Sequence, residues 1–421
     1  MRRSGGQRVR VHKVTLHDTL VGYLTGGEGG RNTLSFSDQF KSAPDRPTLS
    51  LTTHPRFPHA DKVMAEPWVR HQRLHPVLSN LLPEGALREF LARVLKIHID
   101  DEFRMLSHLG RDLPGAIIVE PMAPDEVPDA VLRDSEHVVG FEDLSTVGGF
   151  SLAGVQMKFS MKAREGRFNM SPGDGPGEWI VKTPSTRHDD VPANEFTAMT
   201  LAAVIGVDIP EIRMVPVDTL DSLPAIKLSD EQNAFAIKRF DRRGNQRVHM
   251  EDFAQVLVKY PHEKYGSASY EQIGKIIYRY SGDGLADVQQ FARRLLANIL
   301  LANGDAHIKN WSLLYPDRFT PRLSPAYDIL TTCVYIDGEK HFALNLGKTK
   351  AWHEVSFAHF EHWARKADVP WRAIKPHLDD AVEKARALWP EALEHLPMNR
   401  LHKKALTAHW GRLHPDFVID A

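Results

Sequence analysis

The sequence predicts an α+β fold with a β-rich N-terminal part, a mixed α/β middle part and a mainly helical C-terminal lobe. Apolar and polar residues alternate over residues 9–24, where β-branched side chains are frequent, and this is typical of the two strands of a hairpin. From about Glu251 to the end, apolar residues recur mainly at helical spacing, apart from a loop around Asp305 and a turn near Asp328.

A segment rich in proline and acidic residues, 121–135, predicts a linker and therefore a domain boundary. A chain of 421 residues is long enough for two or three domains. We therefore expect an N-terminal domain at 1–125, a mixed domain at 136–241 and a helical lobe at 242–421.

Further elements are expected in the first two domains. In the N-terminal domain, residues 47–53 and 115–120 predict strands, and a helical pattern from Val77 to Val94 is interrupted by Pro83. In the middle domain, residues 178–182 and 234–239 predict short strands, and a helix is expected between them from Pro192 to Ile205.

The composition excludes several classes of protein. Hydrophobic residues make up 42% of the chain and charged residues 25%, which is ordinary for a globular protein. The formal net charge of −1 argues against a chain whose main task is to bind nucleic acid through its phosphates. The single cysteine, Cys333, precludes a disulfide within the chain, and we expect it to be a small buried residue. No long apolar run and no secretory signal is evident, so we expect a cytoplasmic protein without membrane contact.

The strongest chemical signal lies in residues 303–310, Asn-Gly-Asp-Ala-His-Ile-Lys-Asn, between an apolar helical stretch and a predicted strand. Asp305 and Asn310 are five positions apart, which equals the Asp-to-Asn spacing of a kinase catalytic loop. In such a loop a carboxylate orients the attacking hydroxyl, and an amide oxygen holds Mg²⁺ beside the phosphates. His307 and Lys309 would add positive charge or hydrogen bonds. The alternative is that Asp305 and Asn310 are only turn formers.

Two further positions favour a nucleotide site. Asp328 lies 18 residues after Asn310, where a kinase has its second metal-binding aspartate, and the alternative is a helix N-cap. Lys182 ends a predicted strand, which suits pairing with nucleotide phosphates, and Glu195 in the following helix is the candidate to hold it. The alternative for Lys182 is an exposed lysine at a sheet edge.

Two weaker segments fit the same site. The glycine-containing stretch 149–158 could cover phosphates, although it is not a Walker A loop, and a plain β-turn is the alternative. Residues 236–242 (AIKRFDR) resemble a strand that runs into a linker, whose backbone could bind adenine. The alternative for its arginines is a surface ion-pair cluster. We expect the tryptophans of the C-terminal helices to be core residues; they are Trp352, Trp363, Trp371 and Trp389.

Together these segments resemble the HipA family, serine/threonine kinases that form the toxin half of bacterial toxin–antitoxin pairs. The resemblance covers nearly the whole chain, in order. It rests on residues 80–85 and 109–112, on 151–158, 180–184, 194–195, 239–242 and 251–255, and on 303–310 with the Tyr-Asp-Ile of 327–329. Lys238 and Met157 depart from the residues that are common in the family, glutamate and a charged residue respectively.

The resemblance implies a bilobal, protein-kinase-like fold and a role for each matched position. It implies that Asp305 is the catalytic base, that Asn310 and Asp328 bind Mg²⁺, and that Glu195 supports a phosphate-binding Lys182. It also implies that Ser151 is autophosphorylated, which would silence the kinase. The implied ATP-binding residues are Ala153, Gly154, Val155, Gln156, Met157 and Lys158 of a phosphate loop, Lys182, then Lys238, Arg239 and Phe240 of an adenine hinge, and His307, Lys309, Asn310, Tyr327 and Asp328.

The function that the resemblance implies is ATP- and Mg²⁺-dependent phosphorylation of a protein serine or threonine. The expected substrate is an aminoacyl-tRNA synthetase, and the expected consequences are growth arrest and persistence. The expected partners are a small helix-turn-helix antitoxin (HipB-like) and, through it, operator DNA. Two alternatives stay open: a small-molecule kinase of the aminoglycoside or choline type, and a nucleotide-binding transcriptional co-repressor without essential catalysis.

Overall fold

The structure is a computed structural model that describes residues 8–27, 29–131, 137–138, 157–164, 166–169, 177–223 and 228–420. The chain forms two compact units. The first comprises residues 1–150, 241–261 and 314–320, and the second comprises residues 151–240, 262–313 and 321–421. The three domain boundaries expected from the sequence remain predictions.

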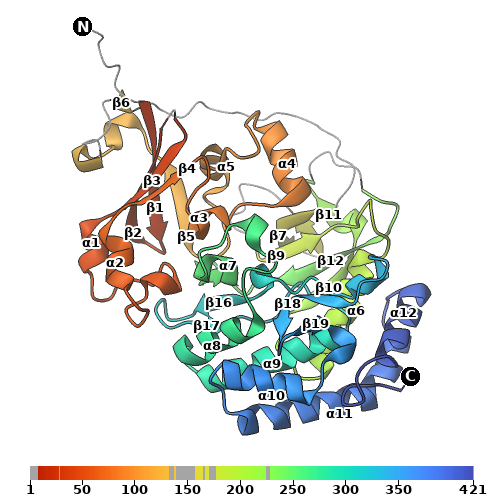
Figure 1. The fold of residues 1–421 in the computed structure, drawn as a ribbon. Coiled ribbons are helices and arrows are strands. Elements are labelled where there is room, and N and C mark those ends of the chain that lie inside the picture. The colour runs from red at the N-terminus through yellow and green to blue at the C-terminus, as the bar shows by residue number, and fades with distance from the viewer. Residues whose placement is uncertain are drawn as a thin grey trace. The chain divides into compact units, whose positions relative to one another are not determined.

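The first unit is built on an antiparallel sheet with the order β4-β3-β2-β1-β5, and β6 pairs in parallel with β1 (Figure 1). The predicted hairpin is confirmed as β1 and β2, in which Val11 lies opposite Thr25. The strands are β1 Arg8–Leu16, β2 Thr19–Gly27, β3 Arg31–Phe36, β4 Trp68–His71, β5 Ile117–Pro121, β6 His137–Val138, β13 Arg242–Arg243, β14 Gln246–Arg247 and β15 His249–Asp252. The helices are α1 Asp38–Ser42, α2 Ala60–Ala65, α3 Pro76–Ser79, α4 Gly85–Val94, α5 Glu102–Leu109 and α7 Phe253–Val256, with 3₁₀ turns at Leu51–Thr53, Pro124–Glu126 and Asp129–Val131.

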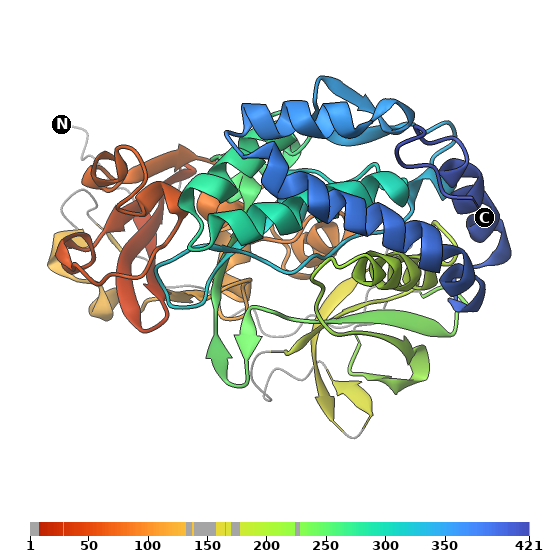
Figure 2. The same ribbon diagram turned by 90° about the horizontal axis from the view of Figure 1, so that it is seen from below.

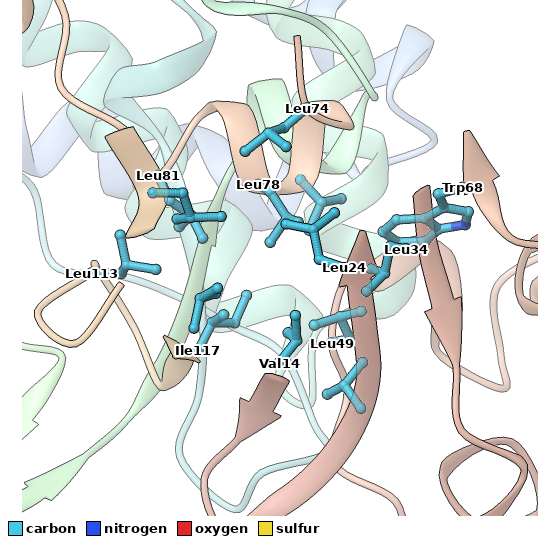
Figure 3. Packing of buried hydrophobic residues seen from close by; sticks show 14 of the residues in the cluster. Val14, Leu24, Leu34, Leu49, Trp68, Leu74, Leu78, Leu81, Leu113 and Ile117 are labelled. Carbon is cyan, nitrogen blue, oxygen red and sulfur yellow. The ribbon is translucent and has the colours of Figure 1, made fainter. Parts of the chain in front are cut away.

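The core of the first unit forms because the strands alternate apolar and polar residues, so that one face of the sheet is apolar. Figure 3 shows this cluster, in which Val14, Leu24 and Leu34 from the strands gather with Leu78 of α3 and Ile117 of β5. All five side chains are almost completely buried.

The predicted strand over residues 47–53 is wrong, because a 3₁₀ turn occupies Leu51–Thr53. The Ser50 N–H donates to the Thr53 hydroxyl at 3.2 Å, and the Leu51 N–H donates to the buried carboxylate of Glu251 at 2.7 Å. Side chains and bonds within the turn, such as that from the Thr53 N–H to the Ser50 carbonyl at 2.8 Å, therefore engage the backbone at Leu51–Thr53 in place of a strand ladder.

The surface ion-pair alternative is wrong for Asp241 and Arg242, which are both buried in the first unit. The Arg242 guanidinium donates to the Asp241 carboxylate at 2.7 Å and to the carbonyl oxygens of Leu113 and Gly115 at 3.0 and 3.1 Å. This pair joins the start of the segment 241–261 to the loop before β5.

The second unit contains a sheet with the order β10-β12-β9-β7-β8-β11 and most of the helices (Figure 2). Its strands are β7 Lys158–Arg164, β8 Arg167–Asn169, β9 Trp179–Lys182, β10 Ile212–Pro216, β11 Leu220–Asp221, β12 Asn233–Lys238, β17 Arg322–Leu323, β18 His341–Leu346 and β19 Thr349–Ala351, and β16 Ser312–Tyr315 lies where the chain passes between the units. Its helices are α6 Val191–Val204, α8 Tyr270–Tyr280, α9 Gly284–Leu300, α10 Phe357–Lys366, α11 Trp371–His395 and α12 Arg400–Trp410.

The predicted elements of the middle domain are confirmed as β9, β12 and α6. Strands β9 and β12 pair antiparallel, with Lys182 opposite Phe235. Helix α6 is buried almost all round its first three turns, polar Asn194, Glu195 and Thr197 included. It packs on β12 and β10 and against α11, where the Trp389 indole donates to the Leu201 carbonyl at 2.9 Å (Figure 2).

Three expectations for the helical lobe need correction. The hairpin β18–β19 interrupts it and was not predicted, because residues 342–344 are all buried and so show no alternation. Trp371 is only half-buried, whereas the other three tryptophans are core residues. Cys333 is half-buried and not fully buried. Across the described residues, no helix is long and apolar enough to cross a membrane.

Candidate active site

Lys182 ends β9 inside the second unit and is buried, so the exposed-edge alternative is wrong. Its ammonium donates to Glu195 in the second turn of α6 at 2.5 Å and also to the carboxylate of Asp328, in the loop after β17. The Glu195 side chain is 1% exposed, whereas that of Asp328 is 24% exposed. One buried cation therefore joins three elements, and of its two anions only Asp328 reaches solvent.

A second lysine faces the same carboxylate. Lys158 at the start of β7 lies opposite Lys182 in the β7–β9 pairing, and opposite residues of an antiparallel pair project from the same face. The Lys158 ammonium lies 3.4 and 3.3 Å from the two carboxylate oxygens of Asp328. The site thus carries two positive and two negative side chains.

Burial and charge act in opposite directions in this cluster. Burial lowers the pKa of Lys182, but the carboxylates of Asp328 and Glu195 outweigh it, so the pKa is raised and the ammonium stays charged. Burial raises the pKa of Asp328, but the ammonium groups of Lys158 and Lys182 reverse this and hold it well below its usual range. Burial raises the pKa of Glu195. The charge of Lys182 lowers it only in part, so the pKa stays above its usual value.

The backbone at Asp328 is strained and firmly held. Its φ is 55°, in the left-handed region that aspartate tolerates better than most residues. The Asn303 amide donates to the Asp328 carbonyl at 3.4 Å. Three residues on, Asn194 of α6 accepts from the Thr331 N–H at 2.8 Å and donates to the Thr331 carbonyl at 3.0 Å. No helix starts at Asp328, so the N-cap alternative is wrong.

The loop 303–310 follows α9 and is fixed through its own backbone. The Asp305 N–H donates to the Asn303 side chain at 3.1 Å, and the Asn310 amide nitrogen donates to the Asp305 carbonyl at 2.8 Å. The Tyr270 hydroxyl donates to the Ala306 carbonyl at 2.8 Å. Asn310 therefore does stabilise the turn, and its amide nitrogen is engaged while its side-chain oxygen remains as a possible ligand.

The Asp305 carboxylate takes no part in holding the turn. Its side chain is 47% exposed, and Oδ1 accepts a hydrogen bond from the Tyr265 hydroxyl at 2.5 Å. The His307 imidazole Nε2 lies 4.0 Å from the same oxygen. A half-exposed carboxylate on a rigid loop is what orienting an incoming hydroxyl requires.

Tyr327 connects the loop to the predicted hinge. Its hydroxyl donates to the Lys309 carbonyl at 2.9 Å, and its ring lies 5.6 Å from that of Phe240. The Lys238 N–H donates to the Glu211 carbonyl and the Arg239 N–H to the Glu178 carbonyl, each at 2.8 Å. These bonds engage the N–H groups of Lys238 and Arg239 within the second unit.

Most of the predicted phosphate loop lies outside the described residues, namely Ala153, Gly154, Val155 and Gln156. The predicted autophosphorylation site, Ser151, lies outside them as well. Met157 is described and buried, and its carbonyl accepts from the Thr183 N–H at 2.9 Å. The Met157 side chain therefore packs in the interior, and the Lys158 side chain, described with it, reaches the charged cluster.

Two protein-family models match this chain. Residues 150–389 match the HipA-like C-terminal domain, and residues 12–120 match the HipA N-terminal domain. A Sinorhizobium fredii protein named "Putative kinase Y4dM" is 41% identical over 394 residues, which is 93% of this chain and 94% of that protein. The "Serine/threonine-protein kinase toxin HipA" of Shewanella oneidensis is 27% identical over 299 residues, 63% of this chain and 65% of that protein.

One solved structure shows the fold. It contains the Shewanella oneidensis toxin–antitoxin system HipA, HipB and its operator DNA, and it aligns with a TM-score of 0.70 at 20% identity, over 96% of this chain and 97% of that chain. The predicted α+β, kinase-like fold is thereby confirmed, and fold and relatives together define a kinase. The chain belongs to the HipA family.

Sequence reasoning missed the contact of Tyr265 with Asp305 and that of Asn194 with Thr331, although Asn194 is among the residues that carry the family resemblance. Tyr265 is 40 positions from Asp305, and Asn194 is 137 positions from Thr331. No local pattern signals contacts over such separations, although Asn194 directly precedes the recognised Glu195.

Proposed function

We propose that this chain is a HipA-type serine/threonine-protein kinase that transfers the γ-phosphoryl group of ATP to a protein hydroxyl. The observation that carries the proposal is the buried Lys182, which contacts both Glu195 and Asp328. A kinase needs a lysine held by a helical glutamate to bind nucleotide phosphates, and an aspartate beside it to bind Mg²⁺.

In the proposed reaction, Asp305 accepts the proton of the acceptor hydroxyl. The hydroxyl oxygen forms a bond to the γ-phosphorus, the bond from that phosphorus to the bridging oxygen breaks, and ADP leaves. The positive charges of Lys182 and Lys158 balance the charge on the phosphate oxygens. Catalysis is then mainly orientation and charge stabilisation, as is general for phosphoryl transfer.

The side chains present fit Mg²⁺. Asp328 offers a partly exposed carboxylate, and the hydrogen bond of the Asn310 amide nitrogen leaves its oxygen as the ligand. Within the described ranges, no three His, Cys, Asp or Glu side chains are grouped to hold a metal by themselves. Mg²⁺ is usually bound by one or two protein oxygens plus phosphates and water. Bound there, Mg²⁺ would neutralise charge on the transferring phosphoryl group.

The remaining roles follow the family resemblance. Adenine would lie between the hinge, at Phe240, and Tyr327, while residues 153–158 would cover the phosphates. Autophosphorylation of Ser151 would add about −1.5 to −2 charge beside those phosphates and so disfavour ATP binding.

The proposed partners are a helix-turn-helix antitoxin and, through it, operator DNA. The Shewanella oneidensis complex contains HipA, HipB and operator DNA and supports this proposal by its overall likeness. The proposed substrate is an aminoacyl-tRNA synthetase, whose phosphorylation would arrest growth and produce persistence.

The test is incubation of the full chain with [γ-³²P]ATP, MgCl₂ and a bacterial lysate, with Asp305→Asn as the matched control. Label in protein that depends on Asp305 supports the proposal. Label only in small molecules would overturn it in favour of a small-molecule kinase. Growth inhibition that persists in Asp305→Asn would instead favour a regulator without essential catalysis.

A further inference from the structure

Tyr265 lies shortly before α8, and its hydroxyl contacts the carboxylate of the proposed catalytic residue. The hydroxyl donates to Asp305 Oδ1 at 2.5 Å although the tyrosine itself is 53% exposed. Its ring meets the His307 ring edge-on, with 5.2 Å between centroids. The Tyr265 side chain therefore contacts both Asp305 and His307.

The hydrogen bonds that hold the loop involve the backbone N–H and carbonyl of Asp305, so they do not orient its side chain. Among the described residues, the carboxylate itself is contacted through Oδ1, by Tyr265 and at longer range by His307. A carboxylate held through one oxygen presents the other in a fixed direction. Reaction rates depend steeply on such orientation.

We infer that Tyr265 is a positioning residue of the kinase reaction, which holds Oδ1 of Asp305 so that Oδ2 faces the acceptor hydroxyl. The inference rests on the proposed role of Asp305. Tyr265 does not touch the acceptor or the nucleotide in this role, so its removal changes the rate of transfer and leaves ATP binding as it is.

The test is Tyr265→Phe, which keeps the ring and its contact with His307 and removes only the hydroxyl. We measure ADP release from ATP and MgCl₂ with myelin basic protein as a generic serine/threonine acceptor. Because a half-exposed hydrogen bond to a charged group is lost, kcat should fall about tenfold while KM for ATP stays within about twofold. Tyr278→Phe, which removes a hydroxyl from a tyrosine on α8, is the matched control and should behave as wild type.

A double variant separates positioning from a general structural effect. Combined with Asp305→Asn, Tyr265→Phe should cause no additional loss, because its effect passes through the Asp305 carboxylate. A wild-type or raised kcat in Tyr265→Phe overturns the inference, and a raised value would mean that the phenol competes with the acceptor. If Asp305→Asn is as active as wild type, the proposed function fails as well, so the two failures are distinguishable.

Discussion

Lys182 neutralises two carboxylates, and one of them has almost no access to water. Lys182→Met would leave Glu195 buried without a counter-charge, while Asp328 would keep Lys158. Removing one partner of a buried pair typically costs about 3–5 kcal/mol. We expect a matching loss in the free energy of unfolding, measured in urea, together with loss of phosphoryl transfer.

The control for this variant is Lys182→Met combined with Glu195→Met, which removes the stranded charge. Stability should recover in the double variant while activity does not. If Lys182→Met alone is as stable as wild type, the ion pair does not contribute in the way that its burial indicates.

Glu251, in the first unit, is a titrating group outside the site. It accepts from the Leu51 N–H and the Tyr315 hydroxyl, its Oε2 has no partner among the described residues, and burial raises its pKa to about 7. Because the folded chain binds this proton more tightly than the unfolded chain, Glu251 favours folding at low pH. That contribution is fully present below the unfolded value of 4.5 and is lost as the pH rises to about 7.

The measurement is a comparison of wild type with Glu251→Gln, whose side chain does not titrate, by urea unfolding from pH 8 to pH 5. Wild type should gain stability relative to the variant as the pH falls, with a slope of at most about 1.4 kcal/mol per pH unit below pH 7. A difference that is constant with pH, or that shrinks, contradicts the assignment.

At the scale of elements, α6 connects both halves of the charged cluster through successive residues. Glu195 holds Lys182, while Asn194 is fully buried and holds Thr331 and the Tyr335 hydroxyl, the last at 3.1 Å. Strain of the kind seen at Asp328 costs about 1–3 kcal/mol and persists only where the surroundings enforce it. The hydrogen bonds of Asn194 to the Thr331 backbone help to hold the loop that contains Asp328.

Asn194→Asp keeps the shape of the side chain but cannot donate to Thr331 and adds a negative charge beside Glu195. We expect the Mg²⁺ concentration that gives half-maximal activity to rise roughly tenfold, because Asp328 loses its fixed position. Asn233→Asp is the matched control, because Asn233 is exposed at the start of β12. An unchanged Mg²⁺ dependence in Asn194→Asp would show that α6 does not position this loop.

Local sequence patterns predicted the helix and strands that position the site. They did not predict contacts between residues far apart in the sequence. Helix α6 and strand β9 carry clear patterns, and so were found with nearly correct ends. The β18–β19 hairpin turns at Gly347 and Lys348, both at positive φ, and a lysine there gives no turn signal. The loop 303–310 was singled out by the spacing of Asp305 and Asn310, whereas the contact of Tyr265 with Asp305 exists only in the folded chain.

At the scale of the whole molecule, the proposed nucleotide site is built entirely from the second unit. Lys182, Glu195, Asp305 and Asp328 all belong to it. A ligand stabilises the structure that it binds, by about 2.7 kcal/mol at a hundred times its Kd. ATP with Mg²⁺ should therefore slow amide hydrogen exchange in residues 157–164, 179–204, 303–313 and 321–331, while the strands of the first unit at 8–36 keep their exchange rates.

Asp328→Asn is the control for this last prediction, because it removes the proposed carboxylate ligand while keeping the side-chain shape. The variant should lose most of the protection that ATP and Mg²⁺ confer on 303–313 and 321–331, and both units should otherwise exchange as in wild type. Equal protection of residues 8–36 and of these two segments in wild type would mean that the nucleotide couples the two units. It would place part of the binding energy outside the site that these residues form.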